Sequence, residues 1–193
     1  LTERLVQFRS DGITPRMFQY NLLKKAQSDQ KRIVLPEGTD DRVLKAAVDL
    51  VQNQAAIIIL LGDAAQIHEK AQQLNLNLHQ EGLQILDPRT APRFESYAQT
   101  LYELRKHKNM DLPMARDLMT DVSYFGTMMV YQGDADGMVS GAVHPTQHTI
   151  RPALQFVKTK PGVSLVSSVF FMCLSDRVTV FGDCAINPNP TAA

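Results

Sequence analysis

Residues 134–155 read DADGMVSGAVHPTQHTIRPALQ and combine the end of a strand with the start of a helix. A short apolar run at residues 136–139 follows an acidic turn, and the small residues 140–142 come next. Thr146 or Thr149 then provides a helix-start signal. This order brings backbone N–H groups and the positive end of a helix to one place, which favours the binding of phosphates and other anions.

Arg151 and Pro152 strengthen the prediction of an anion site. We expect both residues in the first turn of the helix, where an arginine grips phosphate through two N–H groups. A proline suits that turn because its missing N–H would have no partner there. The stretch therefore predicts a phosphate-binding segment, but it does not specify a reaction.

The chain before this stretch alternates strands and helices. Apolar runs at residues 33–35, 55–61 and 84–86 predict buried strands, and helical patterns follow them. The expected helices cover residues 17–27, 43–52, 64–74, 94–107, 113–118 and 124–131. We therefore predict an α/β fold, with a parallel or mixed sheet, helices on both faces and ligands at the strand ends.

The sequence predicts three parts. Residues 1–30 are a helical lead-in or linker, residues 31–140 form the α/β domain, and residues 141–193 begin a second α/β domain that is incomplete. In this last part, apolar runs at residues 165–174 and 177–181 predict a hairpin. Asn189 with Pro190 predicts a helix start that does not continue, so we expect a fragment.

The composition is that of an ordinary globular protein, with 44% apolar and 21% charged residues. A net charge of zero argues against a nucleic-acid partner, and no apolar run approaches the roughly 20 residues of a membrane span. Without a secretion signal, Cys173 and Cys184 are expected as reduced thiols in the cytoplasm. His144 and His148 have helical spacing but no third ligand nearby, so we predict no metal site.

No complete catalytic motif is present: the glycine-rich phosphate loops and the nucleophile elbow are all missing. Ser140 has no His–Asp pair that can be assigned to it, so we interpret it as a small residue at a strand end. Arg105 and Arg42 have two interpretations each, as solvated charges or as phosphate ligands. Cys184 is expected to be buried and unreactive.

Five separated blocks of the sequence resemble the phosphate acetyltransferase family. They occur in the family's order between about residue 15 and the last residue. The blocks are LPEG at residues 35–38 with Arg42, LRKHKNM at 104–110, DGMVSGAV at 136–143, TIRPALQ at 149–155 and GDCAINP at 182–188.

The resemblance implies reversible transfer of an acetyl group between coenzyme A and inorganic phosphate, which gives acetyl phosphate. It implies a two-domain subunit with the architecture of isocitrate and isopropylmalate dehydrogenases, assembled as a cytoplasmic homo-oligomer. Coenzyme A enters as a substrate, and no cofactor is expected. Arg105 and Arg151 match family positions that bind phosphate or coenzyme A, and Ser140, Gly141 and Thr149 are expected to line the cleft.

Two features depart from the family pattern. Pro145 follows His144 where relatives have threonine, and His148 stands where Asp or Asn is common. The family's later Ser-Thr-Gly block, with the Arg and Asp after it, has no counterpart up to residue 193. That Asp is the expected base for the coenzyme A thiol, so we expect no catalytic base in this chain and little activity from it alone.

Three alternatives stay open. A phosphate butyryltransferase differs in the size of its acyl pocket, which the sequence does not specify. A non-catalytic module for coenzyme A sensing or assembly within a longer polypeptide would use residues 1–27 as a linker. A dehydrogenase of similar architecture is the weakest alternative, because no metal-binding set of carboxylates is visible.

Overall fold

The computed structural model describes residues 14–184 and residue 186. The chain divides into two compact units, one of Ala26–Lys158 and one of Leu1–Lys25 with Thr159–Ala193, and each unit is described by itself. The first 13 residues of the expected helical lead-in and the helix start expected at Asn189 lie outside the described residues. The domain boundary expected at residue 140 stays a prediction.

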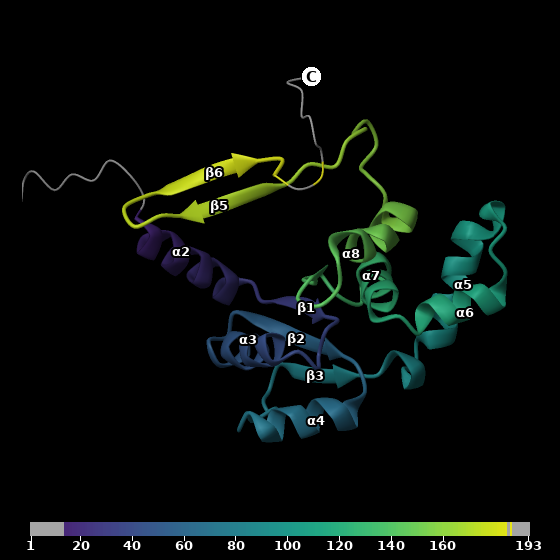
Figure 1. Ribbon diagram of the computed structural model, residues 1–193, viewed down its shortest axis with the longest axis horizontal. Coiled ribbons are helices and arrows are strands. Elements are labelled where there is room, and N and C mark those ends of the chain that lie inside the picture. Colours follow the sequence, from purple (N-terminus) through teal and green to yellow (C-terminus); the bar gives the residue numbers. More distant parts are fainter. Residues whose placement is uncertain (1–13, 185, 187–193) are drawn as a thin grey trace, which may run out of the picture. The chain divides into compact units, whose positions relative to one another are not determined.

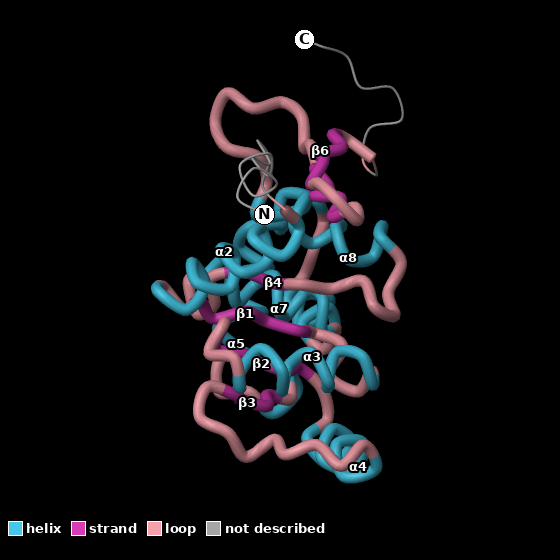
Figure 2. The backbone as a smooth tube through the Cα atoms, turned by 90° about the vertical axis from the view of Figure 1, so that its left-hand side faces the viewer, coloured by secondary structure: helices cyan, strands magenta, loops and turns pink. Residues whose placement is uncertain are grey.

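A four-stranded parallel sheet forms the centre of the unit Ala26–Lys158. Its order is β3-β2-β1-β4, and Figure 2 shows the strands side by side in this order. Every neighbouring pair is parallel, with Val34 opposite both Ile59 and Met138. The strands are β1 (Lys31–Leu35), β2 (Ala56–Leu61), β3 (Leu83–Leu86) and β4 (Gly137–Met138).

Helices cover both faces of this sheet (Figure 1). On one face, α3 (Asp41–Gln52) and α4 (Ala64–Gln73) pack over Ile58 and Leu60. On the other face, α5 (Phe94–Arg105), α6 (Leu112–Met119) and α7 (Val122–Gln132) pack over Ile59 and Leu61. Successive residues of a strand point to opposite faces, so the continuous apolar run of β2 is buried on both sides. The prediction of a parallel sheet flanked by helices is confirmed.

Aspartates cap four helices of this unit. The side chains of Asp40, Asp63, Asp111 and Asp121 accept backbone N–H groups at the starts of α3, α4, α6 and α7. Such caps satisfy donors that have no partner within the helix. Two short 3-10 turns, η1 (Pro88–Thr90) and η2 (Lys106–Lys108), complete the connections around α5.

The helix predicted after residue 145 is present, but its position relative to Arg151 differs from the expectation. Helix α8 (Thr146–Pro152) begins at Thr146 after an extended Pro145, so Arg151 and Pro152 occupy its last turn. The prediction of a first-turn position for these two residues was wrong. The chain continues directly into a π-helix, η3 (Ala153–Val157), whose wider turn is closed by a bond from the Lys158 N–H to the Ala153 carbonyl.

The predicted hairpin is also present, in the other unit. Strands β5 (Val169–Cys173) and β6 (Val178–Gly182) pair antiparallel, and Phe171 contacts Phe18 of α2 (Pro15–Ser28). All five residues of β5 are exposed, because the described residues place no full layer over the hairpin. Cys173 and Cys184 are free and exposed, so the expectation of a buried Cys184 was wrong.

No helix in the described part of the chain is long and apolar enough to cross a membrane.

Candidate functional site

The strand order reverses direction between β1 and β4. The chain moves from β1 outward to β2 and β3, and β4 then adds to the other edge of β1. In open parallel sheets, ligands bind in the crevice outside the carboxyl ends of the strands at such a switch point. The loops that follow β1 and β4 here are residues 36–40 and residues 139–145.

Glu37 joins these two loops. Its Oε2 atom accepts hydrogen bonds from the N–H groups of Gly141 at 3.0 Å and Ala142 at 2.7 Å. Its Oε1 atom accepts N–H groups from Val143 and His144, both at 2.8 Å. Gly141 has φ +107°, a conformation that side chains rarely adopt, and this turns successive N–H groups toward one point. The backbone donors expected to bind phosphate therefore already hold an internal carboxylate.

The environment of Glu37 keeps it ionised. The side chain is only 3% exposed, and burial alone pushes the pKa of its carboxyl upward. The backbone N–H groups of His144, Val143 and Ala142 outweigh this effect and lower the pKa to about 2. Glu37 is thus a buried carboxylate whose charge is satisfied by the turn of residues 141–144.

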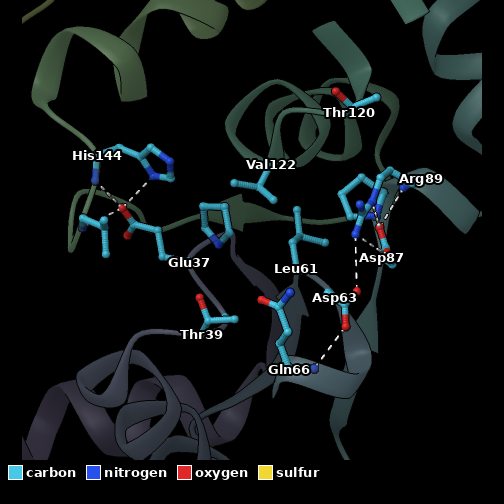
Figure 3. Close-up of a pocket in the computed structure, with 15 residues that line it drawn as sticks. Glu37, Thr39, Leu61, Asp63, Gln66, Asp87, Arg89, Thr120, Val122 and His144 are labelled. Carbon is cyan, nitrogen blue, oxygen red and sulfur yellow. Dashed lines mark hydrogen bonds and ion pairs between the residues drawn. The ribbon is translucent and has the colours of Figure 1, made fainter. Parts of the chain in front are cut away.

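Two stacked histidines continue the network into α8. His144 Nδ1 lies 2.9 Å from Glu37 Oε1, and its ring stacks on His148 with centroids 4.8 Å apart (Figure 3 shows Glu37 and His144). His148 Nε2 lies 3.0 Å from Asp121 Oδ2, while Asp121 Oδ1 caps α7. The start of α8 is therefore connected on one side to the end of β1 and on the other to the start of α7.

Arg151 lies one helical turn after His148 and is exposed. Thr149 lies between them, and its hydroxyl donates to the Pro145 carbonyl at 3.4 Å. Helix α8 has no side-chain cap, in contrast to the aspartate-capped helices of the unit. The cationic group that this segment presents is the guanidinium of Arg151, which does not lie beside a helix start.

Arg105, at the end of α5, lies beside the same segment. Its Nη1 is 3.4 Å from the backbone carbonyl of Gln155, one turn beyond Arg151. Its Nε is buried and has no hydrogen-bond partner among the described residues. The side chain of Gln155 also accepts a hydrogen bond from Tyr124 at 3.1 Å, so this contact region is held from α7 as well.

The two predicted arginines differ from the other arginines of the unit Ala26–Lys158. Among the described residues, neither Arg105 nor Arg151 forms an ion pair with a carboxylate. The other five arginines of the unit each have a carboxylate within 3.4 Å: Arg32, Arg42, Arg89, Arg93 and Arg116. Unpaired guanidinium groups are the ones that remain available for an anionic ligand.

Ser140 and Gly141 immediately precede the turn that Glu37 holds. The Ser140 hydroxyl is buried and has no partner among the described residues, and the Gly141 N–H is taken by Glu37. The structure therefore places Ser140, Gly141, Thr149 and Arg151 on one continuous segment and brings Arg105 to its end. Their roles in substrate binding stay predictions. Arg42, ambiguous from sequence, bonds Asp40 and the Ala142 carbonyl instead.

A cavity of about 490 Å³ lies at the carboxyl ends of β1, β2 and β3 (Figure 3). It contains neither Arg105 nor Arg151. The charged groups of its lining are already paired: Arg89 contacts Asp87 at 3.2 Å and Asp63 at 3.4 Å, and Glu37 holds the turn. The described residues contain no group of three or more His, Cys, Asp or Glu side chains placed to hold a metal ion.

Sequence reasoning missed the part that Glu37 and Asp121 play. Glu37 belongs to the LPEG block, but nothing in its local pattern indicates partners that lie 104 to 107 residues away. The available signal was a charged residue two positions after the end of a strand.

The fold and the site define an α/β protein with a parallel sheet and a positively charged segment next to its switch point. Residues 17–193 match the family model described as "Phosphate acetyl/butaryl transferase", and the chain belongs to this family.

Relatives agree with this assignment. A phosphate acetyltransferase from Nitratidesulfovibrio vulgaris is 56% identical over 192 residues, which are 100% of this chain and 27% of the relative. The EutD phosphotransacetylase from Staphylococcus aureus has a TM-score of 0.79 at 46% identity, covering 88% of this chain and 51% of that one. A phosphotransacetylase from Streptococcus pyogenes has a TM-score of 0.83 at 40% identity, covering 92% and 54%. The chain thus spans about a quarter of the first relative and about half of the two solved structures.

Proposed function

We propose that this chain supplies the phosphate-binding part of a phosphate acetyltransferase, which transfers an acetyl group reversibly between coenzyme A and inorganic phosphate. The observation that carries the proposal is a pair of arginines, Arg105 and Arg151, that form no ion pair with a carboxylate among the described residues. Arg105 Nη1 lies 3.4 Å from the carbonyl of Gln155, which follows Arg151 by one turn. Coenzyme A, phosphate and acetyl phosphate all carry phosphate groups, and guanidinium groups bind phosphate through paired N–H donors.

In the proposed reaction, the thiolate of coenzyme A attacks the carbonyl carbon of acetyl phosphate directly. The bond from that carbon to the phosphate oxygen breaks, and phosphate leaves with its electron pair. Arg151 and Arg105 would neutralise negative charge on phosphate groups, with Ser140, Gly141 and Thr149 lining the cleft. The thiol has an ordinary pKa of about 8.5, so a base is needed at neutral pH. We assign that base outside these 193 residues and expect little turnover from this chain alone.

The proposal also covers the architecture and the assembly of the whole subunit. We expect a cytoplasmic homo-oligomer of two-domain subunits, related in design to isocitrate and isopropylmalate dehydrogenases, with the cleft beside the Arg151 segment. Similarity to the two solved phosphotransacetylases, with TM-scores of 0.79 and 0.83 over about half of their chains, supports the part of this expectation that concerns the fold.

The test is coenzyme A-dependent consumption of acetyl phosphate by the full-length protein, compared with its Arg151→Ala variant. We expect turnover that the substitution lowers by about 10- to 100-fold, which corresponds to the loss of one or two charged hydrogen bonds. Comparison of acetyl-CoA with butyryl-CoA as the donor separates the acetyl from the butyryl specificity. Coenzyme A binding without any turnover by the full-length protein would instead identify a sensing module.

A further inference from the structure

We propose that Glu37 is a positioning residue for the phosphate-binding segment: its carboxylate fixes the turn of residues 141–144 and so sets the start of α8, which carries Arg151. The inference rests on the proposed function, because it assigns Arg151 to substrate binding. Glu37 itself has no role in contacting the substrate.

Both carboxylate oxygens of Glu37 accept hydrogen bonds from the turn. Each oxygen accepts two consecutive backbone N–H groups at 2.7–3.0 Å, and His144 Nδ1 makes a further contact. The four donors belong to one uninterrupted run of backbone, so the carboxylate specifies the conformation of the whole turn. A side-chain amide in the same place offers one acceptor oxygen in place of two and adds N–H donors that face the backbone donors.

Glu37 is itself held rigidly by the centre of the sheet. Pro36 precedes it and is buried, and the Gly38 N–H donates to the Leu61 carbonyl at the end of β2 at 3.1 Å. A Cβ atom at position 38 would lie 2.6 Å from that carbonyl oxygen, so only glycine fits this approach. The carboxylate is therefore anchored to β1 and β2, the two central strands.

The connection from the turn to Arg151 is short and is held by side-chain contacts. One residue, Pro145, separates His144 from α8, and the His144 ring stacks on His148, which contacts Asp121 at 3.0 Å. Arg151 follows His148 by one turn. The turn contributes little to the apolar core, since Val143 is 65% exposed, so we expect its loosening to displace Arg151 without unfolding the sheet.

The test uses Glu37→Gln and Glu37→Ala in the full-length protein, with Glu95→Gln as the matched control. Glu95 is an exposed carboxylate that pairs with Arg116 on the surface. We expect the KM for acetyl phosphate or coenzyme A to rise about 10- to 100-fold in both Glu37 variants, more than kcat falls, because misplacing a binding group by about 1 Å has effects of this size. The control should keep the KM of the parent.

Formate provides the discriminating readout. In Glu37→Ala the four N–H groups form an empty cradle of carboxylate size, so added formate should restore the KM of this variant and leave Glu37→Gln unchanged. Hydrogen exchange should show faster exchange at the amides of residues 141–144 in Glu37→Ala, slowed again by formate, with the amides of β2 unaffected. An unchanged KM in Glu37→Ala, or a raised KM that formate does not lower, would overturn the positioning role.

Failure of the proposed function gives a different result. If the parent protein shows no acetyl transfer, the proposed function fails, and with it the assignment of Arg151 on which the inference rests. The hydrogen-exchange result would then still show whether Glu37 holds the turn.

Discussion

Two regions at the carboxyl edge of the same sheet differ in whether their charged groups have partners within the protein. Around the cavity at β1–β3, each charge is satisfied internally: Glu37 by the turn, and Arg89 by Asp87 and Asp63. Around α8 and the end of α5, Arg105 and Arg151 form no ion pair among the described residues, and the Ser140 hydroxyl has no partner there. Polar groups inside a folded protein are normally paired, so groups without a partner need an explanation. For the two arginines we propose a phosphate-bearing ligand. The cavity at β1–β3 is therefore not the site that the arginines without ion pairs indicate.

Glu37→Gln should give the largest loss of stability. The fall in the pKa of Glu37 from 4.5 to about 2 corresponds to a stabilisation on the order of 3 kcal/mol at neutral pH. Urea unfolding of the parent and the variant at pH 7 measures this difference in the free energy of unfolding. A difference close to zero would mean that the bonds of Glu37 to the turn do not stabilise the fold. The contrast between the two regions would then not hold.

The pH dependence of that difference is a second prediction of similar size. Because the pKa of Glu37 is lower in the folded state, its stabilisation is present above the unfolded-state pKa and is lost as the pH falls from 4.5 toward about 2. The parent and Glu37→Gln should therefore converge in stability over this interval. Other carboxylates titrate there too, which is why the difference between the two proteins is the informative quantity; a constant gap down to the lowest pH would contradict the prediction.

Gly38→Ala should destabilise the unit by about 1–3 kcal/mol through overpacking. The added methyl would lie 2.6 Å from the Leu61 carbonyl oxygen and 2.8 Å from Ile67 Cδ1. Gly137→Ala is the matched control, because its nearest neighbour would be Ile33 Cδ1 at 3.4 Å. In thermal unfolding, Gly38→Ala should have the lower melting temperature of the two variants. Equal melting temperatures would show that the contact between Gly38 and the Leu61 carbonyl is looser than the structure indicates.

Arg105→Ala should weaken coenzyme A binding about 10-fold or more, with little change in stability, because the proposed function has its guanidinium bind a phosphate group. Isothermal titration with coenzyme A measures this in the full-length protein. Arg116→Ala removes an arginine that pairs with Glu95 at 2.9 Å and should leave the affinity unchanged. Equal affinities of the two variants would remove Arg105 from the site.

Arg89→Ala should have the smallest effect. Arg89 is 58% exposed in its ion pairs, and exposed pairs of this kind contribute about 1 kcal/mol or less. Steady-state kinetics should show the KM of the parent. A raised KM would show that the cavity of Figure 3 takes part in substrate binding, and the contrast between the two regions would disappear.

Much of the fold could be predicted because its signals are local. The apolar runs of β1–β3, the aspartate before each of α3, α4, α6 and α7, and the core positions Met128 and Met129 all depend on near neighbours in sequence. The unpaired state of Arg105 and Arg151 could not be predicted, because it depends on where the carboxylates of other elements lie. Glu37 was missed for the same reason, since its partners are more than 100 residues away.

Helix α8 shows the limit of local signals most clearly. Both Thr146 and Thr149 are residues that favour helix starts, and Pro152 favours the first turn. The structure begins the helix at Thr146, the earlier of these two starts, and places Pro152 at its end, where the π-helix η3 follows. Glu37 bonds residues 141–144 and Asp121 contacts His148 beside this start, and the segment's own sequence indicates neither partner.

The central claim is that an arginine left without a carboxylate partner binds the phosphate groups of the substrates. Its most direct test is coenzyme A-dependent consumption of acetyl phosphate by the full-length protein, measured beside Arg151→Ala and Arg116→Ala. We predict that Arg151→Ala loses about 10- to 100-fold in kcat/KM, whereas Arg116→Ala, whose side chain pairs with Glu95, keeps the parent's value. An active parent whose Arg151→Ala variant matches Arg116→Ala would contradict the claim.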